Sequence, residues 1–320
     1  QPLPKRLLIV PDGALQYVPF AALPIAPKSK QSSSQEGRAG IQPPLLITQH
    51  ELVSISSASV LVAVRAETQN RKQPDKQLAV FSDPVFSFTD PRVRQMGAVI
   101  DKTAQEHSTP NLNTSALARS ADDIGIINFE RLAHARQEAI AITSFLPKEK
   151  YWAALDFSAS RATVLQGPLD KYRLIHFATH GILNNQHPDL SGIVLSLIDE
   201  NGKPQNGFLR LDDLYNLNLN ADLVTLSACR TGLGKEIRGE GIVALTRGFL
   251  YAGAKNVVSS LGDVDDAATA ELMKRFYRAL LVEKLTPAAA LRNAQISMLH
   301  DAQWSAPYFW ASFILQGDGQ

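Results

Sequence analysis

The sequence contains a single cysteine, Cys229, among 320 residues. One thiol cannot form an internal disulfide, and it cannot supply a zinc or iron–sulfur site that needs several thiolates. Long apolar runs are also missing, because no stretch approaches the roughly 18 apolar residues of a membrane helix and no amino-terminal segment resembles a signal peptide. We therefore expect a protein of a reducing compartment, the cytoplasm, without membrane contact.

Neither sign of charge is in excess. Lys and Arg number 32 against 31 Asp and Glu, which gives a formal net charge of +1. Nucleic acids and anionic membranes attract proteins with a concentrated positive field, so we expect neither as a partner. The content of 45% hydrophobic and 20% charged residues is ordinary for a globular protein and excludes a disordered or collagen-like chain. Because the chain starts at Gln1 rather than methionine, we expect it to be part of a longer protein.

Short apolar runs alternate with amphipathic helical patterns along most of the chain. Such runs are typical of strands that are covered on both faces. Predicted strands occupy residues 6–10, 45–47, 78–81, 173–178, 223–227, 256–261 and 309–315, and predicted helices occupy 134–146, 242–252, 266–280 and 286–298. This alternation predicts an α/β fold with a mostly parallel central sheet between two layers of helices. Two segments rich in Ser, Pro, Gln and Gly, residues 27–44 and 101–123, are predicted to be long, mobile loops.

Two predicted strands end in residues that could carry chemistry. One strand runs into His180 and Gly181, and another runs into Cys229. Ligands bind beyond the carboxyl ends of parallel strands, so we expect the histidine and the cysteine to lie within reach of each other. A thiol with a pKa of about 8.5 needs a base to become a thiolate near neutral pH, and His180 would be that base. The backbone amides of Gly181 and Cys229 would receive an oxyanion.

Cys229 and His180 could instead be structural residues of the core. A lone cysteine at the end of an apolar strand is more often an inert buried residue than a nucleophile. A histidine after a strand is likewise more often part of the core. The combination of both residues at two strand ends, about 50 residues apart, favours the catalytic interpretation.

Several motifs occur in one order from end to end of the chain. They are LLIVPDG (7–13), YVPFAAL (17–23), HFATHG (176–181), LSAC (226–229), TGLG (231–234), GEG (239–241), DVDD (263–266), ALR (290–292) and PYFWASFILQGD (307–318). Together they resemble the CHAT family of caspase-like peptidases. The resemblance implies a three-layer α-β-α caspase-hemoglobinase fold, shared with separase, metacaspases and gingipains. It also implies cysteine-endopeptidase activity, with Cys229 as the nucleophile, His180 as the base and Gly181 at the oxyanion hole.

The resemblance also implies how the protein is organised and regulated. We expect one domain over residues 1–320, with a pseudo-caspase-like or accessory portion at about 1–125 and the catalytic portion at about 126–320. The expected partners are a protein or peptide substrate and a regulatory tetratricopeptide repeat region or partner protein. No cofactor and no metal are expected. Two residues depart from the family pattern, since Arg230 stands where glutamate is common and Gly262 where tryptophan is common.

Three aspartates follow the predicted strand at 256–261 on the same side of the sheet as His180. Acidic residues at the base of a substrate pocket select Lys or Arg through charge-assisted hydrogen bonds. Asp263, Asp265 and Asp266 are therefore candidates for binding a basic P1 side chain. Asp265 or Asp266 could instead cap the next helix, which makes Asp263 the best candidate.

Other interpretations have less support. His176 and His180 could form a zinc pair, but no further ligands can be placed, so His176 is predicted to be structural. The GLGKE segment at 232–236 departs from a phosphate-binding loop, and no Gly-x-Ser-x-Gly elbow of a serine hydrolase is present. The remaining alternative to a peptidase is a catalytically silent caspase-like scaffold or interaction module.

Overall fold

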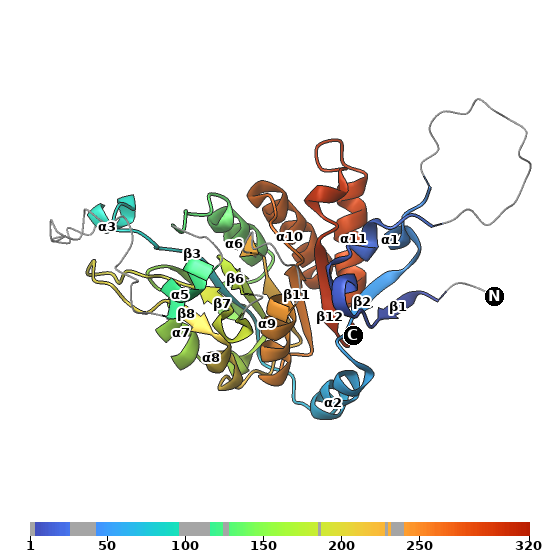
Figure 1. Cartoon of the computed structure of the whole chain (residues 1–320), viewed down its shortest axis with the longest axis horizontal. Coiled ribbons are helices and arrows are strands. Elements are labelled where there is room, and N and C mark those ends of the chain that lie inside the picture. Colours follow the sequence, from blue (N-terminus) through green and yellow to red (C-terminus); the bar gives the residue numbers. More distant parts are fainter. Residues whose placement is uncertain are drawn as a thin grey trace, which may run out of the picture.

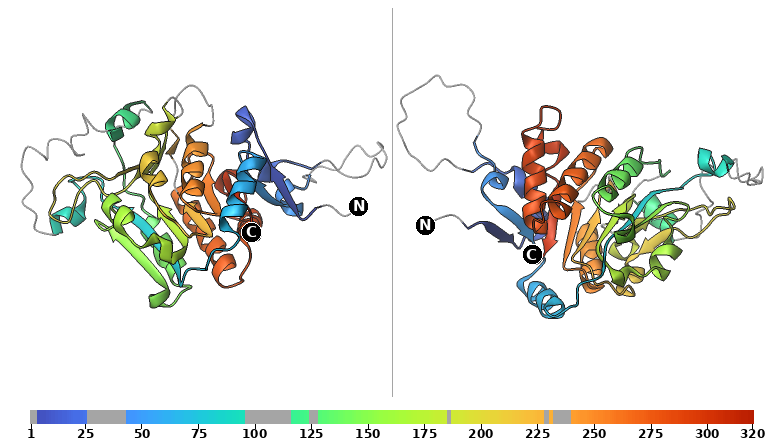
Figure 2. Two further views of the ribbon diagram at one scale, coloured as in Figure 1. Left: turned by 90° about the horizontal axis from the view of Figure 1, so that it is seen from below. Right: turned by 180° about the vertical axis from the view of Figure 1, so that it is seen from behind.

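The computed structural model describes residues 4–25, 43–95, 116–123, 128–184, 187–227, 230–231 and 240–320. Within these ranges an eight-stranded sheet forms the centre of the molecule, with helices on both faces (Figure 1; Figure 2). In spatial order its strands are β1 (Arg6–Ile9), β2 (Glu51–Ser54), β12 (Phe313–Gly317), β11 (Asn256–Ser260), β9 (Leu223–Leu226), β5 (Tyr172–Ala178), β3 (Lys76–Pro84) and β4 (Tyr151–Asp156).

Neighbouring strands of this sheet run parallel except at one junction. Among the described strands of this eight-stranded sheet, only β11 and β12 pair in the antiparallel direction, with Val258 opposite Leu315. The pairs β1–β2, β2–β12, β9–β11, β5–β9, β3–β5 and β3–β4 are all parallel. The predicted α/β fold with a mostly parallel central sheet is therefore confirmed.

Each face of the sheet has its own hydrophobic core. On β3, Ala79 and Phe81 belong to one core and Leu78 and Val80 to the other, because successive side chains of a strand point to opposite faces. The helices that cover the first face are α2 (Ala58–Thr68), α7 (Arg161–Gln166), α8 (Leu211–Tyr215) and α9 (Glu240–Tyr251). Those that cover the second are α6 (Ala135–Thr143), α10 (Asp266–Leu281) and α11 (Pro287–Leu299) (Figure 1). None of the helices in the described ranges is long and apolar enough to cross a membrane.

A second, smaller sheet lies beyond the carboxyl ends of β5 and β9. Its order is β10 (Arg230–Thr231), β6 (Gly181–Leu183), β7 (Gly192–Val194) and β8 (Phe208–Arg210). β6 directly continues the chain that leaves β5, and β10 follows β9 in sequence. The chain therefore passes from the large sheet to the small one at Thr179 and His180, and the end of β9 at Leu226 and the start of β10 at Arg230 bracket a second crossing.

The start of α10, the start of α11 and the end of α9 coincide with residues that favour capping or termination of a helix. Asp265 is the N-cap of α10, since its side chain accepts a hydrogen bond from the amide of Ala268 at 2.8 Å. Thr286 caps α11, which has Pro287 at its first position. α9 stops before Gly253, whose φ of +112° is a conformation that side chains rarely tolerate.

Two predicted strands are partly wrong. Residues 45–47 were expected as a strand, but Leu46–Gln49 forms the short helix α1, and the strand β2 follows it. A run of only three apolar residues is compatible with a buried helical turn as well as with a strand. The strand expected at 309–315 begins only at Phe313, because Pro307–Phe309 forms a 3-10 turn.

The predicted loop at 101–123 is wrong at its end. Ala116–Asp123 forms helix α5, in which the buried Leu117 and Ala121 are one helical turn apart and pack against Phe86 and Phe129. Residues 101–115 and almost all of the predicted loop at 27–44 lie outside the described residues.

The strands β2 and β4 and the helix α2 were not predicted. The remaining short segments are α3 (Pro91–Gln95) and the 3-10 turns Gly13–Tyr17, Phe20–Ala22, Lys148–Lys150, Leu169–Lys171 and Pro188–Leu190.

Candidate functional site

His180 lies in the turn between β5 and β6 and is 6% exposed. Its Nε2 atom lies 2.6 Å from the carbonyl oxygen of Glu130. Because a carbonyl oxygen only accepts hydrogen bonds, Nε2 carries a hydrogen and donates it. In the neutral ring the lone pair is then on Nδ1, which is the atom that can take up a proton.

Two aromatic rings hold the imidazole of His180 in place. The ring centroids of Phe86 and Phe129 lie 5.2 and 5.7 Å from that of His180. These contacts and the hydrogen bond to Glu130 fix the orientation of the ring, as a proton-transferring group requires.

The chain segments on either side of His180 and Cys229 are paired with each other. Upstream, β5 and β9 are parallel neighbours, with Phe177 opposite Leu226. Downstream, β6 and β10 are parallel neighbours, with Ile182 opposite Arg230. Cys229 itself lies outside the described residues, so the predicted proximity of the histidine and the cysteine stays a prediction.

A cleft of about 480 Å³ brings His180 together with the three candidate aspartates. It is lined by Glu130, Arg131, Leu132, Ala133, His134, His180 and residues 263–267. Gly181 is buried as the first residue of β6, opposite Ile193, and does not line this cleft. Its role in an oxyanion hole stays a prediction.

The three aspartates differ in what their carboxylates contact. Asp265 caps α10, as the alternative interpretation expected. Asp266 accepts a hydrogen bond from the backbone amide of His134 at 2.8 Å and lies 3.1 Å from Nδ1 of that residue. Asp263 is exposed at the cleft. Asp263 is thus the most exposed of the three at the cleft, and its role in substrate binding stays a prediction.

The segment at 128–134 was not singled out from the sequence, although it forms one wall of the cleft. Glu130 contributes its backbone carbonyl, which every residue type has, so no sequence signal could have identified it. Arg131 links the segment to the sheet, because its Nε and Nη2 donate to the two carboxylate oxygens of Asp83 at 2.7 Å each.

Asp83 is the centre of a cluster of charged side chains at the end of β3. Besides Arg131, its carboxylate accepts a hydrogen bond from Arg136 at 2.7 Å and lies 3.2 Å from Arg92. Both of these arginines also bind Asp156. The cluster therefore ties the cleft wall at 128–134 to two strands and to α6.

Low pH should destabilise the fold through this cluster. Burial alone would raise the pKa of Asp156, but the hydrogen bonds from Arg136 and Arg92 outweigh burial and lower the pKa. The pKa of Asp90 is lowered in the same way by Arg92. An unfolded aspartate has a pKa of about 3.9, so the stabilisation is complete above that pH and is lost as pH falls through the lower folded-state pKa values. Urea unfolding at constant ionic strength should give a falling free energy of unfolding from pH 5 to pH 2, and an unchanged value would contradict this expectation.

His176, predicted to be structural, is fully buried on β5. Its Nδ1 lies 3.1 Å from the hydroxyl of Tyr277, which donates to Thr225 at 3.1 Å, and its Nε2 lies 2.8 Å from Oε1 of Glu138. Burial raises the pKa of Tyr277, which keeps this hydroxyl protonated. In the described part of the chain, no three His, Cys, Asp or Glu residues are grouped as a metal site would require.

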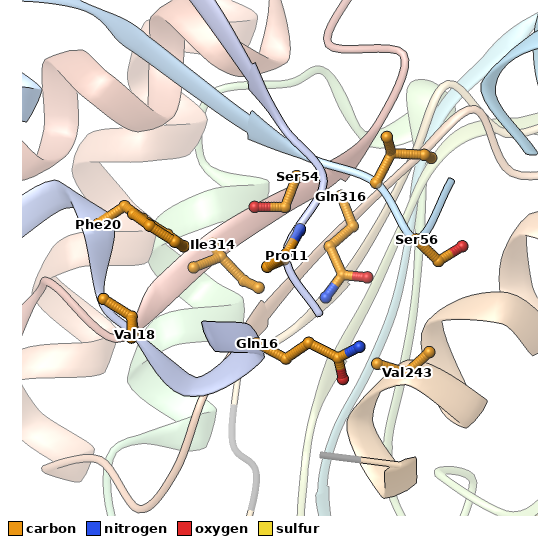
Figure 3. A pocket seen from close by; sticks show the side chains of 10 residues that line it. Pro11, Gln16, Val18, Phe20, Ser54, Ser56, Val243, Ile314 and Gln316 are labelled. Atoms are coloured by element: carbon orange, nitrogen blue, oxygen red, sulfur yellow. The ribbon is translucent and has the colours of Figure 1, made fainter. Parts of the chain in front are cut away.

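A separate, small pocket of about 20 Å³ lies where the amino-terminal segment packs on the sheet. Gln16 and Phe20 from this segment and Ser54 and Gln316 from β2 and β12 line it (Figure 3). Of the predicted catalytic and substrate-binding residues that the structure describes, none lines this pocket.

The fold and the cleft define an α/β protein with a candidate site at the carboxyl ends of β5 and β11. A model of the CHAT domain matches residues 1–318. The chain belongs to the CHAT domain family, as predicted.

One relative and two solved structures illustrate the similarity. The human protein named tetratricopeptide repeat protein 28 is 26% identical over 342 residues, which cover 98% of this chain and 12% of that protein. The chain thus spans only a small part of this relative. Separase from Saccharomyces cerevisiae, in its complex with securin, is 12% identical with a TM-score of 0.44, over 83% of this chain and 14% of that chain. The Arg-specific cysteine proteinase gingipain R is 11% identical with a TM-score of 0.41, over 84% of this chain and 54% of that chain.

Proposed function

We propose that the chain is a cysteine endopeptidase in which Cys229 is the nucleophile and His180 the base. The observation that carries this proposal is the pairing of the strands on both sides of these residues, β5 with β9 and β6 with β10. Membership of the CHAT family and the fixed tautomer of His180 support it. We also propose that the catalytic portion lies at about residues 126–320 and that about residues 1–125 are accessory to it.

The proposed reaction proceeds through an acyl-enzyme. His180 accepts the thiol proton on Nδ1, and the sulfur of Cys229 attacks the scissile carbonyl carbon. The backbone amides of Gly181 and Cys229 receive the negative charge that develops on the carbonyl oxygen. His180 then protonates the leaving amine, and it activates the water that hydrolyses the thioester.

We propose that the substrate is cleaved after a basic residue. The cleft beside His180 has carboxylates at Asp263, Asp265 and Asp266 along one side. Asp263 is exposed, whereas Asp265 and Asp266 are partly buried, so the Asp263 carboxylate is the most accessible of the three to a substrate.

Asp263→Asn should therefore weaken cleavage after basic residues selectively. Because the carboxylate is exposed, an effect of about 3- to 10-fold on kcat/KM is expected for P1 Arg or Lys peptides. Cleavage of a matched peptide with an uncharged P1 residue should change little. An equal loss with both peptides, or no loss with either, would contradict the assignment.

We propose that a regulatory region or a partner protein controls the peptidase activity. The human relative is named for its tetratricopeptide repeats, and the match covers 12% of it. We propose that such repeats, or a separate protein, control access to the cleft. Activity of the chain should then differ between this segment alone and a longer protein that includes a repeat region.

Cleavage of a peptide library tests the proposed function. Products ending in Lys or Arg are expected from the wild-type protein and should disappear in Cys229→Ala. If the wild-type protein cleaves no peptide, with or without a repeat region, the alternative of a catalytically silent scaffold would be supported instead.

A further inference from the structure

A second pocket adjoins the cleft beside His180. It has a volume of about 370 Å³ and is lined by five residues between 86 and 91, which follow β3, and by residues 128–131. Glu130 and Arg131 line both this β3-side pocket and the cleft. Phe86 and Phe129, whose rings hold the imidazole of His180, also line the pocket. The two spaces therefore meet at the segment that orients His180.

The order of the strands places the two spaces on opposite sides of His180. β11, β9, β5 and β3 are successive parallel neighbours, so their carboxyl ends lie along one edge of the sheet. The cleft residues 263–267 follow β11, His180 follows β5, and the pocket residues at 86–91 follow β3. Along this edge the order is therefore the three aspartates, the end of β9, His180 and the β3-side pocket.

An extended substrate bound across this edge would reach the β3-side pocket with the residues that follow the scissile bond. In the proposed function, the P1 side chain lies at the aspartates and His180 protonates the leaving amine, so the chain continues past His180 towards β3. Neighbouring strands are about 4.8 Å apart, and an extended peptide advances about 3.3 Å per residue. The step from β5 to β3 thus corresponds to one or two residues, P1′ or P2′.

The charge that this pocket offers to a substrate is negative. Asp90 and Arg131 line it, but both belong to the cluster in which the carboxylates of Asp83, Asp90 and Asp156 pair with three arginines. Within the described part of the chain, the exposed carboxylate of Glu130 pairs with no cation. Glu130 therefore gives the pocket its uncompensated charge.

We infer that the β3-side pocket is a subsite for the primed side of the substrate and takes a cationic P1′ or P2′ side chain, with the Glu130 carboxylate as its partner. The inference rests on the proposed peptidase function and adds a specificity-determining residue on the leaving-group side. A volume of about 370 Å³ is in the range of pockets that hold small ligands, so a long side chain fits. An acidic side chain would be repelled there.

The test uses peptides with a P1 residue that the wild-type protein accepts and with Lys or Glu at P1′ or P2′. The wild-type protein should have a higher kcat/KM for Lys than for Glu at one of these positions. Glu130→Gln should lower this Lys-to-Glu ratio about 3-fold, as expected for an exposed ion pair, and Glu130→Lys should invert the preference. Both variants keep the backbone carbonyl that binds His180.

Glu149→Gln is the matched control, because Glu149 is exposed in the 3-10 turn that precedes β4, at the opposite edge of the sheet. It should keep the wild-type Lys-to-Glu ratio. A wild-type protein without a charge preference at P1′ and P2′, or a ratio that Glu130→Gln leaves unchanged, would overturn the inference.

Asn128→Asp separates the β3-side pocket from the cleft, because Asn128 lines the pocket and not the cleft. The added carboxylate should raise the Lys-to-Glu ratio at the primed position about 2-fold or more and leave the preference at P1 unchanged. Changes confined to P1 in these variants would overturn the inference. If the wild-type protein cleaves no peptide, the proposed function fails and the inference fails with it. Cleavage with the same primed-side selectivity in all variants refutes only the inference.

Discussion

His180→Ala is expected to lower kcat/KM for peptide cleavage by about 10²- to 10⁴-fold, the range that a positioned acid and base contributes. Without the imidazole, only the few per cent of Cys229 that ionises spontaneously near pH 7 can attack, and the leaving amine receives no proton. The remaining activity of the variant should rise with pH as the thiol approaches its ordinary pKa of about 8.5. Steady-state cleavage between pH 6 and pH 9 measures both effects.

The exposed His300 provides the control for this substitution, because it ends α11 far along the chain from the cleft. His300→Ala should keep wild-type kcat/KM. If His180→Ala retains more than about a third of the wild-type value while remaining folded, His180 is not the base.

Asp83→Asn is expected to destabilise the folded protein by about 3–5 kcal/mol, the usual cost of removing one partner from a buried ion pair. Asp83 is 1% exposed and contacts Arg92, Arg131 and Arg136. Its φ of +51° suits asparagine, so this substitution tests the charge without adding backbone strain. The free energy of unfolding in urea at pH 7 measures the effect.

Asp170 is a matched control, since it is exposed and begins a 3-10 turn. Asp170→Asn should change the free energy of unfolding by no more than about 0.5 kcal/mol. A loss below about 1 kcal/mol for Asp83→Asn would show that the charge cluster does not stabilise the cleft wall.

The central strands could be predicted because a strand that is buried on both faces appears in the sequence as a continuous apolar run. β5, β9 and β11 are short apolar runs, and the helices α9, α10 and α11 repeat apolar residues at helical spacing. The start of α10 at Asp266 was predicted, and Asp265, one of the two candidate caps, is the cap. The three-residue strands β6, β7 and β8 are too short to show any periodicity.

From the sequence, the candidate site could be predicted only for residues whose side chains can take part in catalysis or binding. His180 and the aspartates at 263–266 could be identified, and they do line one cleft. The Glu130 carbonyl that orients His180 has no side-chain signature.

Covalent labelling tests the central claim most directly. A peptide with a basic P1 residue and a thiol-reactive electrophile at the scissile position should add one mass equivalent to the intact protein, and peptide mapping should place it on Cys229. The label should be absent in Cys229→Ala and greatly slowed in His180→Ala. Failure to label Cys229 in the folded protein, both alone and together with the proposed regulatory region, would contradict the account.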